Sequence, residues 1–502
     1  MRLWEGVLLA SNLALVILLL IGRPSNTKRR TMWIAAGLSV GALAVHLTME
    51  GYRFQLFASY LAAVLLLAAW GASRNRDSKG RRVFAKTVAI CSLPLLLLSG
   101  AAAQLIPVFQ LPGLPGPYAV GTEIVHAVDA SREDLLASQP GTKRELIIQV
   151  WYPADDSAKG KRMPFIPDGR QQLAAFADRM NLPQVTLDYL RYVKSRSYEG
   201  AAVRREVAGY PLLILNHGYG TTRLLHVEQA ESLASRGYVV ASIDHTYGNM
   251  ATVFPDDRVA EYRIDTDRFD ESAAYRDQIG KEWANDILFT LAYMEQLSAG
   301  EGPNRNFAGV IDTTRVGVLG HSFGGAASYL ASADDRIKAG IDMDGTLVGF
   351  EGGEALNKPF MWLSTLSTFE MYKKVLRLDE SSGAKLDGFG STPEKYEAMV
   401  KLAKAELKHI RELMERKGEM LVAEGAEHYN FTDAPRLSPL LPKTGMTGGM
   451  KADRSARLIN DVVADFFDRH LKGEPAEAKL LQTYPELEDV KSQFLSESRG
   501  LE

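Results

Sequence analysis

Apolar residues crowd the first 109 positions of the chain, whereas the remainder alternates between short apolar runs and charged segments. Four long apolar stretches follow one another, at Leu3–Gly22, Met32–Met49, Leu56–Ala72 and Val88–Val108. About 20 apolar residues in a helix suffice to cross the hydrocarbon core of a bilayer. These stretches are apolar on every side, unlike the amphipathic helices of a soluble domain. The pattern therefore predicts a domain of four transmembrane helices over residues 1–109.

The loops between these stretches differ in charge. Loops 23–30 and 73–82 hold four and five Lys or Arg, whereas loop 50–55 holds Arg53 against Glu50. Basic loops stay on the cytoplasmic side, so we expect a multi-pass plasma-membrane protein whose region after Val108 is extracytoplasmic. The first stretch could instead be a cleaved secretory signal. Its weakly charged start and the three further apolar stretches favour a retained span.

From Gln110 onward the composition is that of a soluble globular domain. The Pro/Gly segment 110–118 cannot continue the fourth helix. Short runs rich in Val, Ile and Leu then end in turn residues, which predicts strands. The predicted strands are 145–153, 211–218, 238–245, 315–322, 337–344, 359–365 and 418–425, and the clearest helical patterns are 282–297 and 455–471. Apolar strands separated by helices predict an α/β fold, with a mostly parallel central sheet covered on both faces.

Two charged, largely helical insertions interrupt the domain predicted over residues 110–475, near 167–202 and 366–417, and residues 476–502 are predicted as a C-terminal tail. Each insertion is either a solvated helix with ion pairs or a cap over a site, and the pattern favours neither. The net charge of −3 gives no reason to expect a nucleic-acid partner. The single cysteine, Cys91, lies in the fourth apolar stretch, where we expect it to pack as a small hydrophobe.

A candidate nucleophile lies in "LGHSFGGAAS", residues 319–328. The segment fits the pattern G-x-S-x-G, with Gly320, Ser322 and Gly324 at the defining places. A serine on a tight turn from strand to helix is exposed for attack, and small neighbours let the two elements approach closely. The context matches, because a predicted strand precedes the motif and a helical pattern follows it. We therefore predict that Ser322 is a nucleophile.

A serine hydroxyl needs a base, and in this arrangement the base follows the serine in the chain. Of the three later histidines, His409 lies in a charged helix and is expected at the surface, whereas His470 suits the end of the last helix. His428 follows the strand 418–425 directly, where a sheet presents side chains at its carboxyl edge. We predict His428 as the base, and no metal or cofactor.

The carboxylate that orients the base should lie on a rigid element. Asp344 ends the strand after that of the serine, and the period-two pattern places Asp342 on the same face. Asp344 is closer to the carboxyl end and is the preferred candidate. Asp342 is expected to hydrogen-bond locally within the sheet, and Glu370 is the less favoured alternative acid.

Two backbone N–H groups should bind the oxyanion of an acyl-transfer reaction. One belongs to Phe323, directly after the nucleophile. The other is predicted at Tyr219, in the glycine-flanked segment "HGYG" that ends an earlier strand. His217 and His321 adjoin these turns and are expected to be structural hydrogen-bonding residues rather than second bases.

Four segments together resemble the plasma-type platelet-activating-factor acetylhydrolases, a branch of the α/β-hydrolases. They are residues 211–245, "GHSFGG" at 320–325, "AGIDMDG" at 339–345 and "EHYNFTD" at 427–433. The resemblance covers about residues 111–473 and excludes the four apolar stretches. It implies the α/β-hydrolase fold, a metal-free mechanism and short or oxidised acyl chains as substrates. By position, it implies Ser322, Asp344 and His428 as nucleophile, acid and base, and Tyr219 and Phe323 as oxyanion donors.

These features predict a membrane-anchored, extracytoplasmic serine ester hydrolase acting on short-acyl or lipid esters. The same residues could serve an acyltransferase or a peptidase. A non-catalytic membrane sensor is a further alternative, in which Ser322 would not react with a fluorophosphonate. A site within the spans is hinted at only by His46 and Glu50, one helical turn apart, which are more plausibly interfacial.

Overall fold

The computed structural model describes residues 1–501 apart from 22–25, 74–78, 302–304, 379–392 and 476–479. Parts of both basic loops, of the second insertion and of the predicted tail lie outside the described residues. The chain forms two compact units. The first contains residues 1–110, 164–193 and 437–440, and the second contains 111–163, 194–436 and 441–502. Part of the first insertion therefore belongs to the same unit as the N-terminal helices.

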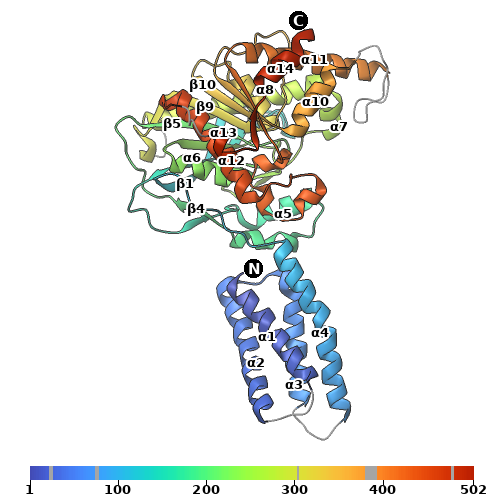
Figure 1. The fold of residues 1–502 in the computed structure, drawn as a ribbon. Coiled ribbons are helices and arrows are strands. Elements are labelled where there is room, and N and C mark those ends of the chain that lie inside the picture. The colour runs from blue at the N-terminus through green and yellow to red at the C-terminus, as the bar shows by residue number, and fades with distance from the viewer. Residues whose placement is uncertain (22–25, 74–78, 302–304, 379–392, 476–479, 502) are drawn as a thin grey trace. The chain divides into compact units, whose positions relative to one another are not determined.

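The first unit is built on a bundle of four helices (Figure 1). They are α1 (Leu3–Leu20), α2 (Asn26–Val45), which a π-turn extends over His46–Glu50, α3 (Phe57–Ser73) and α4 (Lys79–Leu105). In the described part of the chain, these four are the helices long and apolar enough to cross a membrane. Residues 164–193 add the helix α5 (Gly169–Arg179) and two short 3₁₀ turns.

The interior of the bundle combines small residues with leucines such as Leu15 and Leu66, and many large apolar residues lie on its outside. Ala62 and Ala89 are fully buried, whereas Leu97 and Leu98 are 74% and 62% exposed. Polar groups are paired in the interior, where the Ser39 hydroxyl donates to a buried asparagine at 2.7 Å. This distribution is typical of helices that pack within a bilayer. Cys91 is exposed on the outward side of α4, whose buried residues are alanine, serine and Leu96.

The second unit is organised by a sheet of 11 strands among the described residues, in the order β13-β12-β11-β10-β9-β5-β6-β2-β1-β4-β3. Its central strands are parallel. They are β12 (Gly418–Ala423), β11 (Phe360–Thr365), β10 (Ile337–Met343), β9 (Ile311–His321), β5 (Tyr210–Asn216) and β6 (Val239–Asp244). These six strands and β2 (Lys143–Ala154) match the seven predicted from the apolar runs. The α/β fold with a mostly parallel sheet is confirmed.

Helices cover both faces of this sheet (Figure 1). On one face, Val316 and Val318 of β9 pack with α8 (Ala273–Ser298) and α9 (Phe323–Ala331). On the other face, Gly317 contacts Phe467 of α12: a Cβ on Gly317 would lie 2.5 Å from the Phe467 ring. The helices of this second face are α6 (Val227–Ser235) and α12 (Ala452–Phe467). α10 (Leu366–Leu376) and α11 (Pro393–Glu415) pack over β11 and β12 and share their apolar cluster.

The edge strands are those that the apolar pattern does not reveal. β1 (Ala119–Glu133) pairs antiparallel with β2, and β4 (Lys194–Glu199) and β3 (Arg162–Pro164) follow it at that edge. At the other edge β13 (Leu487–Asp489) pairs antiparallel with β12, in the segment predicted only as a tail, with α13 (Leu480–Thr483) before it and α14 (Lys491–Glu497) after it. Edge strands are half exposed and carry many polar residues, so their hydrophobic signal is weak.

Candidate active site

Ser322 stands on a sharp turn between β9 and α9. Its backbone has φ 56° and ψ −125°, a conformation that a non-glycine residue adopts only under strain. The flanking glycines allow the turn: a Cβ on Gly320 would lie 2.1 Å from the carbonyl oxygen of Gly324, and one on Gly324 would lie 2.3 Å from that of His217. The strand-turn-helix context predicted from the motif is therefore present, and it exposes the serine at the carboxyl end of the central strand.

The structure brings together Ser322, His428 and Asp344, which lie on three separate segments. The serine Oγ is 3.0 Å from Nε2 of His428, and Nδ1 of the same ring is 2.7 Å from Oδ2 of Asp344. His428 begins a 3₁₀ turn just after β12, and Asp344 follows β10. With Nδ1 donating to the carboxylate, Nε2 is free to accept the serine proton.

The carboxylate of Asp344 is buried and held on both sides. Its Oδ1 accepts a hydrogen bond of 2.9 Å from the backbone N–H of Thr365, at the end of β11. Burial pushes the pKa of Asp344 upward, but the hydrogen bond from His428 and the partial charge of that ring outweigh it, so the pKa is lowered from its ordinary value. Asp344 therefore stays ionised and keeps the imidazole in one orientation.

Asp342 has a different place, although the strand pattern puts it near Asp344. Its Oδ1 accepts from the backbone N–H of Gly345 at 2.7 Å, beneath the turn that carries Ser322. Burial, opposed by that hydrogen bond, raises the pKa of Asp342 well above its usual range. The residue is thus a neutral, local hydrogen-bonding partner, as expected. The alternative acid Glu370 is half exposed on α10 and pairs with Lys373.

The other two histidines after the serine are occupied elsewhere. Nε2 of His470 is 3.1 Å from Oε1 of Glu419, at the beginning of β12 and away from its carboxyl end. His409 is buried, with Nε2 2.9 Å from the hydroxyl of Tyr329. The prediction that His409 lies at the surface is wrong, because α11 turns that side of an otherwise charged helix toward an aromatic cluster.

The two predicted oxyanion donors lie beside the serine. A Cβ on Gly218, the residue before Tyr219, would approach Cβ of Ser322 to 3.2 Å, so this loop runs against the nucleophile. Phe323 starts α9 directly after the serine. Within the described residues, neither the N–H of Tyr219 nor that of Phe323 has a backbone or side-chain acceptor. Two unpartnered amides beside a serine suit an oxygen that gains negative charge.

Two more histidines lie behind the base, and the sequence pattern assigns one of them no role. Nε2 of His321 donates to the backbone carbonyl of His428 at 2.9 Å, and the two rings are 4.6 Å apart. His226 lies beyond, with its ring 5.8 Å from that of His321 and no hydrogen-bond partner for either nitrogen among the described residues. "RLLH" at 223–226 carries no motif, so only the fold could reveal His226 there.

The burial of His226 predicts a dependence of stability on pH. Burial lowers its pKa from 6.5 to about 4, so the folded chain keeps the ring neutral while the unfolded chain protonates it below pH 6.5. The stability this group contributes is complete above pH 6.5 and falls as the pH drops toward 4. When the pH is lowered from 8 to 5, the free energy of unfolding of the wild type should therefore fall by about 2 kcal/mol more than that of His226→Leu. Denaturant unfolding at both pH values checks this, and parallel curves would contradict it.

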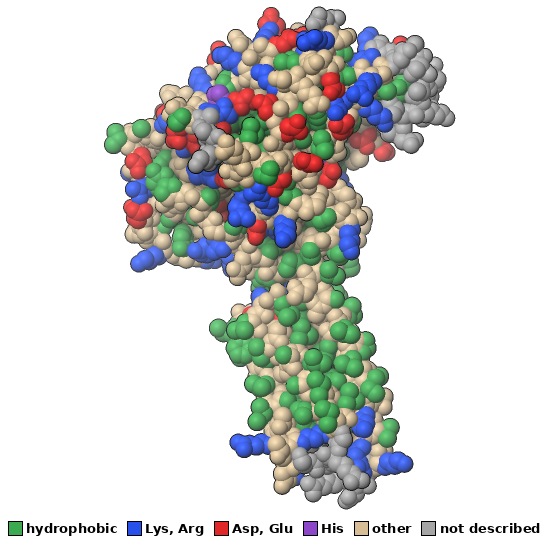
Figure 2. Space-filling view, in the orientation of Figure 1, with side chains coloured by type: hydrophobic (Ala, Val, Ile, Leu, Met, Phe, Trp, Pro, Cys, Tyr) green, Lys and Arg blue, Asp and Glu red, His purple; other side chains and the backbone are tan. Residues whose placement is uncertain are grey.

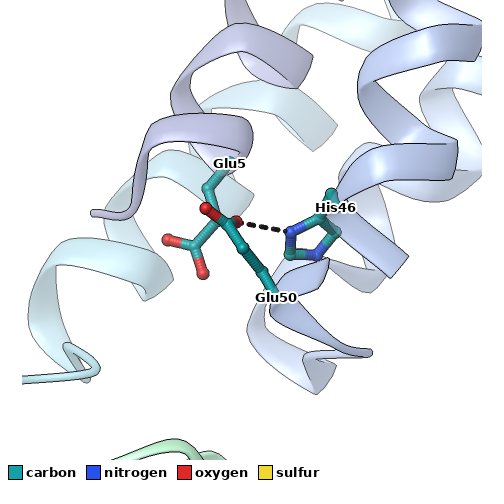
Figure 3. A group of neighbouring side chains, drawn as sticks. All are labelled: Glu5, His46 and Glu50. Atoms are coloured by element: carbon teal, nitrogen blue, oxygen red, sulfur yellow. Dashed lines mark hydrogen bonds and ion pairs between the residues drawn. The ribbon is translucent and has the colours of Figure 1, made fainter. Parts of the chain in front are cut away.

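The first unit contains the two residues, His46 and Glu50, that suggested a site within the spans. Glu5, His46 and Glu50 lie together (Figure 3), with potential ligand atoms within 4.8 Å of one another. Both oxygens of Glu5, however, accept from Arg53 at 2.9 and 3.0 Å, and Arg2 donates to it at 2.8 Å. One ring nitrogen of His46 meets Glu50 at 2.9 Å and the other a tyrosine hydroxyl at 2.7 Å. The donor set is an internal ion-pair network, and its two guanidinium groups do not suit a bound cation.

A mostly parallel sheet with a strained serine between strand and helix, followed in the chain by an acid and a histidine, is the arrangement of the α/β-hydrolase fold, to which many serine ester hydrolases belong. A ferulic acid esterase from Streptomyces cinnamoneus has a similar structure, with a TM-score of 0.58 and 26% identity, covering 76% of this chain and 99% of that protein.

The sequence comparisons narrow the class. The family model described as platelet-activating factor acetylhydrolase, isoform II, matches residues 104–475. A platelet-activating factor acetylhydrolase of Gallus gallus is 23% identical over 55% of this chain and 69% of its own length. A probable 1-alkyl-2-acetylglycerophosphocholine esterase of Arthroderma benhamiae is 27% identical over 50% of this chain and 63% of its own length. The chain belongs to the platelet-activating factor acetylhydrolase family, which confirms the resemblance seen in its motifs.

Proposed function

We propose that this protein is a membrane-anchored, extracytoplasmic ester hydrolase that uses Ser322, His428 and Asp344 to cleave short-acyl or lipid esters. The observation that carries the proposal is the continuous path of hydrogen bonds from the serine hydroxyl through the imidazole to the buried carboxylate, at 3.0 and 2.7 Å. No other serine in the described chain stands on such a turn. The family and the serine hydrolase class agree with this arrangement.

The geometry supports acylation of the enzyme in the first half of the reaction. Nε2 of His428 takes the hydroxyl proton as Oγ of Ser322 attacks the ester carbonyl carbon, whose oxygen becomes an oxyanion. The amides of Tyr219 and Phe323 bind that oxyanion, each contributing about 3 kcal/mol to the transition state. His428 then gives its proton to the departing alcohol oxygen as the C–O bond breaks, which leaves an ester on Ser322.

Hydrolysis of this acyl-enzyme repeats the same steps with water. The water oxygen attacks the acyl carbon while His428 accepts a proton from the water. His428 then returns the proton to Oγ of Ser322 as the acid leaves. Asp344 stays ionised throughout and stabilises the imidazolium that forms twice in each cycle. The side chain of His428 is 41% exposed, so water can reach its Nε2.

The bundle supports the membrane part of the proposal. Hydrophobic side chains cover much of its outward surface (Figure 2), and the buried Ser39 and Asn12 are hydrogen-bonded to each other inside it. Exposed Arg29 and Arg30 near the start of α2, and Lys79, Arg81 and Arg82 near the start of α4, form a basic cluster at one end. Basic ends of spans remain on the cytoplasmic side, so this cluster and the even number of spans support our proposal that the region after α4 is extracytoplasmic.

The substrate proposal follows the family and the tether. Relatives are named for an acetylated glycerophosphocholine or for platelet-activating factor. A hydrolase anchored in a bilayer also meets esters delivered by that bilayer. We therefore propose a glycerophospholipid with a short acyl group as substrate class, with the short acid and the lyso-lipid as products.

One assay on intact cells tests both the substrate and the side of the membrane. Cells that express the full chain should release acetate from a membrane-impermeant 2-acetyl glycerophosphocholine added outside, and the rate should fall steeply as the acyl chain is lengthened. Cells that express Ser322→Ala are the matched control. Activity that appears only after permeabilisation would contradict the extracytoplasmic placement. Transfer of the acetyl group to an added alcohol in preference to water would favour an acyltransferase.

A further inference from the structure

The carbonyl of Gly218, in the loop of the predicted oxyanion donor, is held by three donors. His217 donates to it from Nδ1 at 2.8 Å, and Thr221 donates from both its hydroxyl, at 2.8 Å, and its backbone N–H, at 3.0 Å. A trans peptide is planar, with its C=O and N–H on opposite sides. Fixing the carbonyl of Gly218 toward these donors therefore turns the N–H of Tyr219 to the opposite side. That N–H has no acceptor within the described residues.

The protonation state of His217 is defined by its contacts. Nδ1 faces a carbonyl oxygen and must carry the hydrogen, whereas Nε2 accepts the backbone N–H of His245 at 3.2 Å and must be bare. Burial and the neighbouring ring of His245 lower the pKa of His217 well below its usual range. The ring is thus a neutral donor with a fixed direction, and it does not act as a second base.

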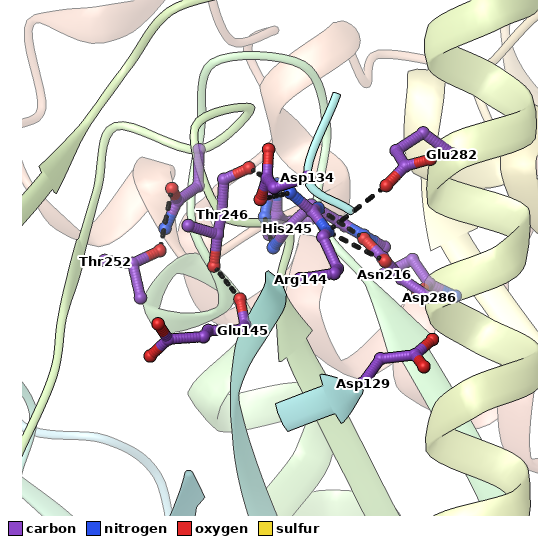
Figure 4. A network of polar contacts seen from close by, with 12 residues as sticks. Asp129, Asp134, Arg144, Glu145, Asn216, His245, Thr246, Thr252, Glu282 and Asp286 are labelled. Atoms are coloured by element: carbon purple, nitrogen blue, oxygen red, sulfur yellow. Dashed lines mark hydrogen bonds and ion pairs between the residues drawn. The ribbon is translucent and has the colours of Figure 1, made fainter. Parts of the chain in front are cut away.

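His245 is itself held by a buried polar network (Figure 4). Its Nδ1 is 3.0 Å from Asp286, whose carboxylate pairs with Arg144 at 2.6 Å. All three side chains are buried. The ring also stacks on Trp283, with centroids 4.1 Å apart and planes 5° from parallel. The ion pair and the indole ring together fix the position of His245, so its backbone N–H donates to His217 in a fixed orientation.

We propose that His217 and Thr221 are positioning residues of the oxyanion hole, which hold the Gly218 carbonyl so that the Tyr219 N–H faces the reacting ester oxygen. The inference rests on the proposed function, since it assigns a task within that reaction. Neither side chain touches the substrate; both act through one peptide group. Because three hydrogen bonds hold the carbonyl of this peptide group, its N–H need not reorient when the oxyanion forms. Such preorganisation is the condition for strong electrostatic stabilisation.

Thr221 offers the sharper test, because Val keeps its shape and Ser keeps its hydroxyl. Thr221→Val in the full chain should lower kcat on p-nitrophenyl acetate about 10- to 100-fold with KM within a factor of about two, since a misaimed donor weakens only the transition state. The Ki of an aliphatic trifluoromethyl ketone, whose adduct with the serine is an oxyanion, should rise by the same factor. Thr221→Ser should restore both values to near those of wild type.

A second pair of variants guards against loss of folding. His217→Asn keeps an N–H donor near the position of Nδ1 and should retain more activity than His217→Leu at equal melting temperature. If Thr221→Val binds the ketone as tightly as wild type, or if Thr221→Ser is as impaired as Thr221→Val, the inference is wrong. A wild-type chain that neither hydrolyses the ester nor binds the ketone would instead overturn the proposed function.

Discussion

Ser322→Ala should lower kcat on p-nitrophenyl acetate by on the order of 10⁶-fold and abolish labelling by a fluorophosphonate. The serine Oγ is the atom that would form the ester bond to the acyl group, and it lies 3.0 Å from Nε2 of His428. Removing it takes away covalent catalysis and leaves only the oxyanion donors to stabilise attack by water. Steady-state assays of the purified full chain, with active-site titration of the wild type, measure the ratio.

Ser157→Ala is the matched control, because Ser157 is exposed and its hydroxyl contacts only a neighbouring aspartate in the described chain. It should keep full activity and labelling. Ser322→Ala should melt at about the wild-type temperature, since alanine has similar backbone freedom and Ser322 is only partly buried. A Ser322→Ala enzyme that retains a hundredth of wild-type activity, or that is still labelled, would remove the basis of the proposed mechanism.

The sequence could predict the residues of the candidate site because each lies at the carboxyl end of a strongly apolar strand. Ser322, Asp344 and His428 follow β9, β10 and β12, which are neighbours or near neighbours in one parallel sheet. The carboxyl ends of parallel strands meet at one edge, so chain order and strand pattern suffice to bring them together. Tyr219 follows β5, the neighbour of β9, and joins the same edge for the same reason.

The supporting residues could not be predicted, because their roles depend on contacts between distant segments. Asp286 and Trp283 lie in the helical pattern 282–297, but nothing in their spacing indicates that they contact His245. The burial of His409 does not show in the pattern, because one side of an otherwise charged helix packs against aromatic residues. The edge strand β1 has polar residues at half-buried places, so its period-two signal is diluted. Contacts between distant segments determine the role or the burial of each of these residues, and the local pattern of a single sequence does not predict such contacts.

His428→Ala should be as damaging as loss of the serine, with kcat lowered on the order of 10⁶-fold, because an alcohol without a base is a poor nucleophile. Since the His428 side chain is 41% exposed, the variant should leave an open space, and added imidazole should restore part of the activity in proportion to its concentration. The same assay applied to Ser322→Ala should show no such rescue, which separates the base from the nucleophile.

The two other late histidines give controls with distinct outcomes. His470→Ala should keep wild-type kcat, because its partner Glu419 lies at the opposite end of β12. His409→Ala should keep kcat per folded molecule but destabilise the fold by about 1–3 kcal/mol, since the buried hydroxyl of Tyr329 loses its contact with the imidazole and keeps only the longer one with the Leu356 N–H. Activity normalised to folded protein distinguishes these effects. An active His428→Ala, or an inactive and fully folded His409→Ala, would show that a different imidazole carries the proton.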